Sequence, residues 1–185
     1  MAGKLELKGK RVLVIGLART GIATALYCAE RGAIVTATDT RGADELGECV
    51  AKLRAAGVQL QLGGYSNEIL HGQELVVPSP GVPADSLVLS AALTAKIPVW
   101  SEIELAFRYL NGRLIGITGS NGQTTTSSLV HHILRQAGFS ALLAGNIGTP
   151  LISQVTETNE KTLTVAELSS FQLELIETFR PTISV

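Results

Sequence analysis

The sequence predicts an α/β protein built on parallel sheet, and three observations support this fold class. Short apolar runs alternate along the chain with segments of helical period, which is the pattern of parallel-sheet proteins. The apolar runs are continuous, as expected for strands that are covered on both faces. A glycine-containing loop stands between an apolar run and a helical segment twice, at Gly16–Gly21 and at Gly116–Gly122.

The first half of the chain predicts strands and helices in alternation. The opening strand is wholly apolar, and Ile22, Ala25 and Leu26 recur after it at helical spacing until Gly32 ends the helix. Gly57 ends the second helix in the same way. We expect strands at 12–15, 34–38, 58–62, 74–77 and 97–100, and helices at 20–31, 43–56, 84–95 and 101–110.

The turn-forming triplet Asn111-Gly112-Arg113 marks the predicted domain boundary, because a new strand begins directly after it. One domain is therefore expected at 1–110 and a second at 111–185. In the second we expect strands at 114–118, 141–144, 163–166 and 182–185, a helix from the glycine loop to Ala137, and a helix at 171–178. If this sheet lacks further strands, its edge is unpaired and this half should be marginally stable or self-associating.

Composition and charge exclude several classes of protein. The 185 residues carry 15 Lys and Arg against 16 Asp and Glu, so no basic field is available to hold a nucleic acid. No apolar run approaches the roughly 18–20 residues that span a bilayer, and the N-terminal apolar stretch is too short for an export signal. Cys28 and Cys49 lack partners at metal-binding spacing, which favours free thiols in the cytoplasm.

The first glycine loop has the position of a nucleotide-binding turn. It joins a strand to a helix, although Ala18 replaces the middle glycine of the dinucleotide pattern. A tight turn followed by a helix N-terminus presents backbone N–H groups to a phosphate. Asp39 ends the second strand, where a ribose-binding carboxylate is found in such folds, and Thr40 and Arg41 follow it. The alternative is a plain turn in which Asp39 caps a helix.

The second glycine loop, Gly116 to Thr125, resembles a phosphate-cradling P-loop. Its spacing is G-x-x-G-x-x-G, and Thr124 supplies the hydroxyl that such loops use for Mg²⁺. Gln123 occupies the position at which the general pattern has a lysine for the β- and γ-phosphates. Because a neutral amide cannot offset the charge that develops on a phosphate, we expect weakened ATP binding and loss of turnover. A decayed or coincidental loop is the alternative.

Several segments taken together resemble the amino-terminal portion of the Mur ligases, and among them the ligases that add D-glutamate. The resemblance covers essentially the whole chain but not the whole family, whose members have three domains. It implies a Rossmann-like UDP-binding domain followed by the start of a P-loop-type ATPase domain. The matching segments are Gly16–Gly21, Asp39–Arg41, Ser79–Pro83, Ser101–Leu105, Gly116–Thr126, Gly145–Pro150 and Glu167–Glu174.

The resemblance also implies an activity, cofactors and partners. Such ligases use ATP and Mg²⁺ to add D-glutamate to UDP-N-acetylmuramoyl-L-alanine through an acyl phosphate, in the bacterial cytoplasm during peptidoglycan synthesis. It implies a monomer when full length, with no nucleic-acid or membrane partner. A chain that stops early in the second domain and carries Gln123 is expected to be inactive alone. The alternative is a non-catalytic Rossmann-like module for NAD or a sugar nucleotide, and Ala18 and Thr40-Arg41 favour UDP over NAD.

The resemblance assigns site residues position by position. The substrate would be bound by Arg19, Thr20, Asp39, Thr40, Arg41, Ser79, Pro80, Gly81 and Asn146. ATP would be bound by Gly119, Ser120, Asn121, Gly122, Gln123, Thr124 and Thr125. Thr124 and Glu167 would be metal ligands, and no catalytic residue is assigned. From the residues alone, Glu102 and Glu104 are interpreted as electrostatic support for a helix end.

Overall fold

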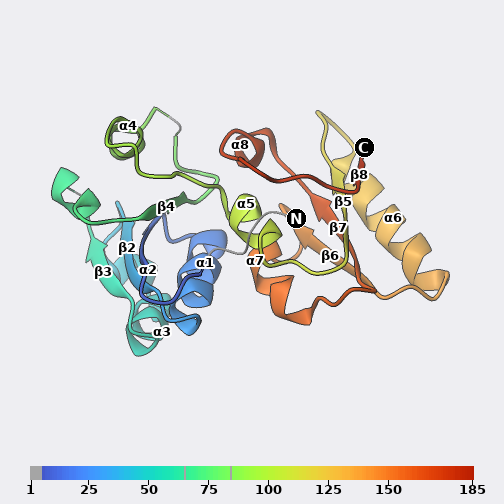
Figure 1. Cartoon of the computed structure of the whole chain (residues 1–185), viewed down its shortest axis with the longest axis horizontal. Coiled ribbons are helices and arrows are strands. Elements are labelled where there is room, and N and C mark those ends of the chain that lie inside the picture. The colour runs from blue at the N-terminus through green and yellow to red at the C-terminus, as the bar shows by residue number, and fades with distance from the viewer. Residues whose placement is uncertain (1–5, 65, 84) are drawn as a thin grey trace. The chain divides into compact units, whose positions relative to one another are not determined.

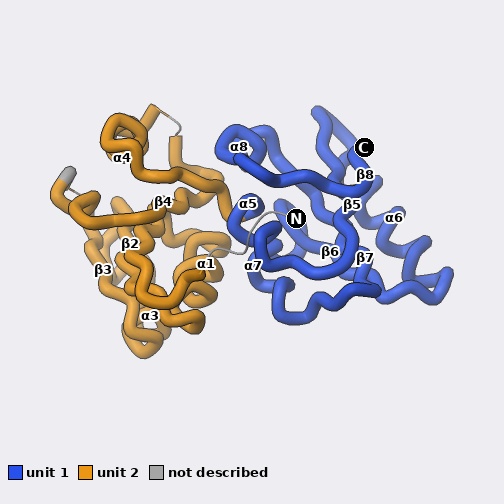
Figure 2. The backbone as a smooth tube through the Cα atoms, in the orientation of Figure 1, with its two compact units in different colours: residues 1–4, 103–185 blue, residues 5–102 orange. Residues whose placement is uncertain are grey.

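A computed structural model describes residues 6–64, 66–83 and 85–185 of the chain, which form two compact units (Figure 2). In chain order, the first unit ends at Glu102 and is drawn in orange in Figure 2, where the key calls it unit 2. The second begins at Ile103 and is drawn in blue, where the key calls it unit 1. Both units are α/β, and every strand pair in them is parallel, so the predicted fold class is confirmed. Within the described residues, no helix is long and apolar enough to cross a membrane.

The first unit contains a four-stranded sheet with the order β3-β2-β1-β4 (Figure 1). Its strands are β1 (Arg11–Ile15), β2 (Ile34–Asp39), β3 (Gln59–Leu62) and β4 (Leu75–Pro78). In register, Val12 of the central strand β1 lies between Val35 and Leu75. The chain first adds β2 and β3 on one side of β1, and then places β4 on the other side of β1. The carboxyl ends of β1 and β4 therefore form a switch point, which is where open α/β sheets bind ligands.

Residues 97–100 do not form the regular strand that the sequence predicts, so that prediction is wrong. The segment makes an isolated parallel bridge between Val99 and Val76 on the outer side of β4. Its two backbone bonds run from the Val76 N–H to the Pro98 carbonyl, 2.9 Å, and from the Trp100 N–H to the Val76 carbonyl, 3.0 Å. Pro98 has no N–H to donate, and Lys96, two residues before it, has a φ of 57°. The ladder therefore cannot extend.

The helices of the first unit cover both faces of its sheet (Figure 1). α1 (Arg19–Glu30) and α3 (Glu48–Ala55) pack on one face, against β1, β2 and β3. On the other face, η1 (Asn67–Leu70) and α4 (Leu87–Thr94) close a core over β1 and β4. Residue 84, where a helix was expected to begin, lies outside the described residues. The core residues there are Leu13, Ile15, Ile69, Leu70, Val76, Val88, Leu89 and Ala92.

The helix predicted at 43–56 is two helices, α2 (Ala43–Leu46) and α3. Gly47 separates them with a φ of 60° and a ψ of −134°. That conformation is open to glycine and strained for residues with a side chain. Hydrophobic spacing carries across the break, which is why the sequence pattern indicated one helix.

The second unit repeats the architecture with a sheet of order β6-β7-β5-β8. Its strands are β5 (Arg113–Ile117), β6 (Ala141–Gly145), β7 (Leu163–Glu167) and β8 (Ile183–Ser184). The long helix α6 (Gln123–Gln136) lies along this sheet and packs Val130 and Leu134 onto Ile115, Ile117 and Val165. Shorter elements complete the unit: α5 (Glu102–Phe107), α7 (Leu151–Gln154), η2 (Val155–Glu157) and α8 (Ser170–Leu173).

Glu104 explains two differences between the predicted and observed elements of this unit. It is fully buried in α5, and its carboxylate accepts hydrogen bonds from the N–H groups of Glu177 (2.9 Å), Thr178 (2.9 Å) and Phe179 (2.7 Å). These amides are thus turned away from a helix, so the helix predicted at 171–178 is the single turn α8. The same bonds hold α5 in the second unit, so the units divide before the predicted boundary at Asn111.

The interpretation of Glu104 as support for a helix end is therefore wrong. Its carboxylate also accepts the Thr178 hydroxyl at 2.6 Å and forms an ion pair of 2.8 Å with Arg108. Burial acts to raise the pKa of Glu104, but the bonds from Thr178 and the neighbouring amides outweigh it and lower that pKa. Glu104 is the polar anchor of the segment that leads into β8.

Candidate functional site

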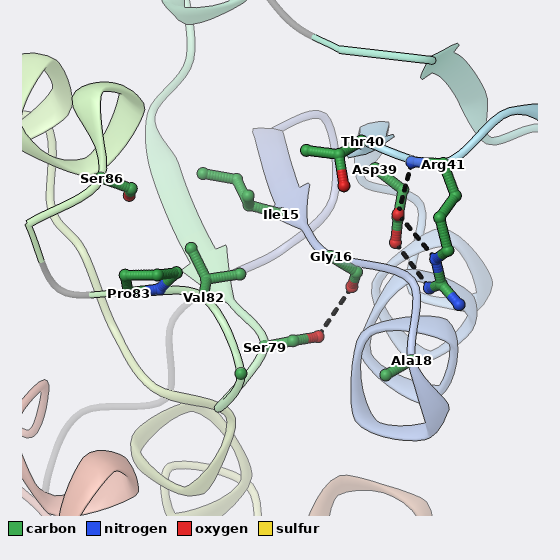
Figure 3. Close-up of a pocket in the computed structure, with 11 residues that line it drawn as sticks. Ile15, Gly16, Ala18, Asp39, Thr40, Arg41, Ser79, Val82, Pro83 and Ser86 are labelled. Carbon is green, nitrogen blue, oxygen red and sulfur yellow. Dashed lines mark hydrogen bonds and ion pairs between the residues drawn. The ribbon is translucent and has the colours of Figure 1, made fainter.

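A pocket of about 270 Å³ opens at the carboxyl ends of β1, β2 and β4 in the first unit (Figure 3). This is the switch point of the sheet, where the sequence places its first glycine loop. Five of the residues that the sequence analysis assigns to substrate binding line it: Asp39, Thr40, Arg41, Ser79 and Gly81. The lining is Ile15, Gly16, Ala18, Asp39, Thr40, Arg41, Ser79, Gly81, Val82, Pro83 and Ser86.

Asp39 organises one side of this pocket. Its Oδ2 accepts the Leu17 N–H at 2.6 Å. Figure 3 shows its bonds with Arg41: Oδ2 accepts the Arg41 Nη2 at 2.8 Å, and Oδ1 accepts the Arg41 Nε and N–H at 2.9 Å each. Asp39 is 6% exposed, whereas the Arg41 side chain is 44% exposed. The Arg41 guanidinium holds the pKa of Asp39 well below its usual range, against the effect of burial. A carboxylate that is ionised at neutral pH thus fixes both the glycine loop and the guanidinium.

Two glycines allow the loop to close tightly on α1. Gly16 has a φ of 85° and donates its N–H to the Thr38 carbonyl at 2.8 Å. A Cβ on Gly21 would stand 1.8 Å from the Gly16 carbonyl oxygen, so only glycine fits there. From β4, the Ser79 hydroxyl donates to that carbonyl at 2.7 Å (Figure 3). The loop is therefore held from both neighbouring strands.

The N-terminus of α1 faces the pocket without a side-chain cap. Ala18 is the N-cap residue, its side chain makes no cap bond, and the first turn contains no acidic residue. An uncapped helix end carries a partial positive charge and directed N–H groups, which suit a phosphate. Arg19 and Thr20 belong to this first turn and do not line the pocket. Pro80, which was also assigned to the substrate, does not line it either.

Ser86 is a pocket residue that the sequence analysis missed. It lies at the N-cap position of α4, and its buried Oγ has no hydrogen-bond partner in the described part of the chain. A serine directly before an apolar run is a recognised helix-start signal. That signal could have predicted the start of α4, but not that Ser86 lies at the pocket.

The second glycine loop lies between β5 and α6. Gly122 has a φ of 76° and is the N-cap residue of α6, whose first turn has no acidic residue. Thr124 and Thr125 are exposed in that turn. The Gln123 side chain folds back along the loop, and its Nε2 donates a hydrogen bond to the Gly119 carbonyl. Of the predicted ATP-binding residues, Gly119 to Gly122 thus lie in the loop and Gln123 to Thr125 in the first turn of α6.

Glu167 and Asn146 lie beside this loop at the same edge of the sheet. Glu167 ends β7 and is in register with Ile117, the last residue of β5. The Asn146 N–H donates to the Glu167 carbonyl at 2.9 Å, and its Nδ2 donates to Glu167 Oε1 at 3.1 Å. Glu167 is 3% exposed, and its Oε2 has no hydrogen-bond partner among the residues described. A carboxylate oxygen with this free acceptor capacity suits a hard cation.

The predicted site residues therefore fall into two groups. The pocket group lies in the first unit, while Asn146 lies in the second unit with the ATP group and Glu167. In the described ranges, no cluster of three or more His, Cys, Asp or Glu residues could hold a metal by itself. Cys28 and Cys49 are free thiols, and burial raises the pKa of Cys28 to about 12, so it is not a nucleophile at neutral pH.

Two family models match the chain, one for each unit. Residues 10–101 match the model described as Mur ligase MurD-like, N-terminal domain. Residues 117–185 match the model described as Mur ligase middle domain.

Curated relatives match over nearly the whole chain. A protein of Koribacter versatilis is 45% identical over 180 residues, which are 97% of this chain and 40% of the relative. A protein of Anaeromyxobacter dehalogenans is 47% identical over 176 residues, which are 95% of this chain and 38% of the relative. Both are named UDP-N-acetylmuramoylalanine--D-glutamate ligase. The chain thus spans about 40% of the length of the curated relatives it matches.

Solved structures agree with the fold. A pseudomurein peptide ligase type C from Methanothermus fervidus matches 88% of this chain and 33% of its own, with a TM-score of 0.50 and 25% identity. A ligase for UDP-N-acetylmuramate and L-alanyl-gamma-D-glutamyl-meso-diaminopimelate from Neisseria meningitides matches 85% of this chain and 52% of its own, with a TM-score of 0.53 and 20% identity. By its two matched domains and its relatives, the chain belongs to the Mur ligase family.

Proposed function

We propose that this chain is the amino-terminal part of a ligase that adds D-glutamate to UDP-N-acetylmuramoyl-L-alanine. The first unit would bind the UDP-linked substrate, and the second would contribute the phosphate loop of the ATP site. The complete enzyme would form the amide through an acyl phosphate, in the bacterial cytoplasm. The names of the relatives support this substrate pair. The monomeric state expected from the sequence stays a prediction.

One observation carries the choice of UDP over NAD. Both carboxylate oxygens of Asp39 already accept hydrogen bonds, from Leu17 and from Arg41. In NAD-binding folds the acidic residue at this strand end accepts the ribose hydroxyl groups, and here it is occupied. The pocket instead offers the half-exposed Arg41 guanidinium and the exposed Thr40, which suit the carbonyl oxygens and hydroxyls of a uridine.

The other end of the pocket suits the diphosphate of such a ligand. The Gly16–Gly21 loop leads to the uncapped N-terminus of α1, so its backbone donors would face the phosphate oxygens. The Ser79 hydroxyl is committed to the Gly16 carbonyl and would act by holding the loop. Asn146 lies in the second unit, and its assignment to the substrate stays a prediction.

In the second unit, Thr124 and Glu167 would hold Mg²⁺ together with nucleotide phosphates. The unpartnered Oε2 of Glu167 fits this role, because Mg²⁺ is usually bound by one or two carboxylates plus substrate phosphates. The bound ion would neutralise charge on the phosphoryl group. The described residues of this chain place no basic side chain in the loop itself, so we propose that the chain is inactive alone.

Calorimetric titration with UDP-N-acetylmuramoyl-L-alanine tests the proposal, with NAD and Mg·ATP run beside it. We expect saturable binding of the UDP ligand and none of NAD. Binding of NAD in place of the UDP ligand would identify a dinucleotide module and overturn the assignment. Absence of binding of the UDP ligand would contradict the claim that the first unit forms the site for this ligand.

A further inference from the structure

The lysine position of the second glycine loop holds a side chain that is both neutral and already engaged. Gln123 begins α6, and its amide donates to the carbonyl of Gly119 at the other end of the loop. In P-loops a lysine at this place reaches the β- and γ-phosphates. Gln123 offers no charge, and its donor is directed to the protein.

Among the described residues, the segments next to the loop supply no basic side chain that could replace that charge. The segments that follow β5, β6 and β7 at the loop's edge of the sheet are 118–130, 146–151 and 168–173, and they contain no Lys, Arg, Asp or Glu. The charged side chain next to them is Glu167, which ends β7. The fixed positive potential of the loop thus reduces to the backbone N–H groups and the N-terminus of α6.

Glu167 gives the site a negative charge that is not neutralised by a partner. Its Oε1 accepts from the Asn146 amide, while its buried Oε2 accepts from no described residue. A nucleotide without metal would bring several further negative charges to this carboxylate. A nucleotide that carries a divalent cation would bring an ion that both Glu167 and the Thr124 hydroxyl can bind.

We propose that Gln123 makes nucleotide binding at this loop strictly dependent on a divalent cation. The cation is the counter-charge that a lysine would otherwise share, and Glu167 converts from a repelling group to a ligand when the cation is present. Gln123→Lys should relax the dependence, because a lysine and a cation on the same phosphates partly substitute for each other. The inference rests on the proposed function in assigning the loop to a nucleotide.

Equilibrium binding of ADP to the whole chain tests this, with Mg²⁺ and with EDTA. For the unmodified chain we expect EDTA to weaken binding at least about a hundredfold, and for Gln123→Lys about tenfold or less, the difference being that between neutral and charge-assisted hydrogen bonds. Gln123→Met is the matched neutral control and should keep the strict dependence. Thermal unfolding followed by circular dichroism shows whether each variant is folded.

Three results would overturn the proposal. One is binding of metal-free ADP by the unmodified chain within about tenfold of Mg·ADP. Another is an equal effect of EDTA on Gln123→Lys and Gln123→Met. The third is no binding of Mg·ADP by either the unmodified chain or the folded lysine variant. If a variant does not fold, titration of Mg²⁺ into the unmodified chain with ADP decides by itself. None of these results bears on UDP-ligand binding by the first unit, so the two proposals fail separately.

Discussion

At the scale of single residues, two buried carboxylates have different roles, one at a pocket and one in the interior of a unit. Asp39 lies at the pocket of the first unit, and its carboxylate holds the glycine loop and orients Arg41. Glu104 stands inside the second unit and ties an irregular segment to α5. Both are stabilised in the charged form by several donors, and the pKa of each is lowered. Removing either charge should therefore leave donors unpaired.

Asp39→Asn tests the first carboxylate. The amide cannot accept all the donors of Leu17 and Arg41, so we expect about 1–3 kcal/mol loss in free energy of unfolding of the first unit. We also expect at least about tenfold weaker binding of the UDP ligand. Urea unfolding and calorimetry measure the two effects. An unchanged affinity for the UDP ligand would contradict the role given to Asp39.

The stability of the first unit should depend on pH through the same residue. The pKa of Asp39 is lowered in the folded state, so its contribution is fully present above the unfolded pKa of about 4 and is lost as the pH falls through the folded value. Between pH 6 and pH 3 the free energy of unfolding should fall more steeply for the unmodified chain than for Asp39→Asn. Parallel pH profiles of the two proteins would refute this.

Glu104→Gln tests the second carboxylate. We expect the second unit to lose about 2–4 kcal/mol of stability, because a buried charge with four donors and an ion pair is replaced by an amide that repels some of them. Glu160→Gln is the control, since Glu160 is an exposed turn residue of the same unit. Equal unfolding midpoints for the two variants would show that the network around Glu104 adds no stability.

At the scale of elements, the sequence predicted those whose hydrophobic period is long and misjudged those set by distant contacts. The parallel strands, α1 and α6 follow from apolar runs and helical spacing alone. The wrongly predicted elements are explained by Gly47, Pro98 and Glu104. Each of these residues acts through backbone geometry or through a partner far along the chain. The pocket residues Asp39 to Arg41 were predicted from a strand end, and Ser79 from the family resemblance. Ser86 required the tertiary packing of α4.

The close approach of α1 to its loop gives an element-scale prediction. Gly21→Ala places a methyl group against the Gly16 carbonyl, so the loop must open. We expect loss of UDP-ligand binding by at least about tenfold and a stability loss of about 1–3 kcal/mol. Gly42→Ala is the matched control, because the nearest atom to its added Cβ is a Glu45 side-chain oxygen at 3.8 Å. Equal calorimetric affinities of the two variants would count against the tight loop.

At the scale of the whole molecule, the two units differ in how much apolar surface they expose. The first unit exposes Ile34, Leu87 and Leu93 among its large apolar residues. The second exposes a larger set, on α6, α8 and β8 and between them. These residues are Leu129, Ile133, Phe139, Phe171, Ile176, Ile183 and Val185. Apolar surface gathered on one unit favours association through it.

The chain should therefore self-associate through its second unit as concentration rises. The double variant Leu129→Lys, Ile133→Lys changes two exposed positions one helical turn apart on α6 and should reduce association in sedimentation velocity. Leu93→Lys, on the exposed surface of the first unit, is the control and should not. A monodisperse monomer for the unmodified chain at every concentration would contradict this prediction.

The most direct test of the central claim, that the first unit is the site for the UDP-linked substrate, is backbone hydrogen exchange with and without UDP-N-acetylmuramoyl-L-alanine. The account predicts slower exchange on binding in 16–22, 39–41 and 79–83, the segments that form the pocket and the N-terminus of α1. NAD at the same concentration should leave them unchanged. Unaltered exchange in these three segments, or equal protection by NAD, would contradict the claim.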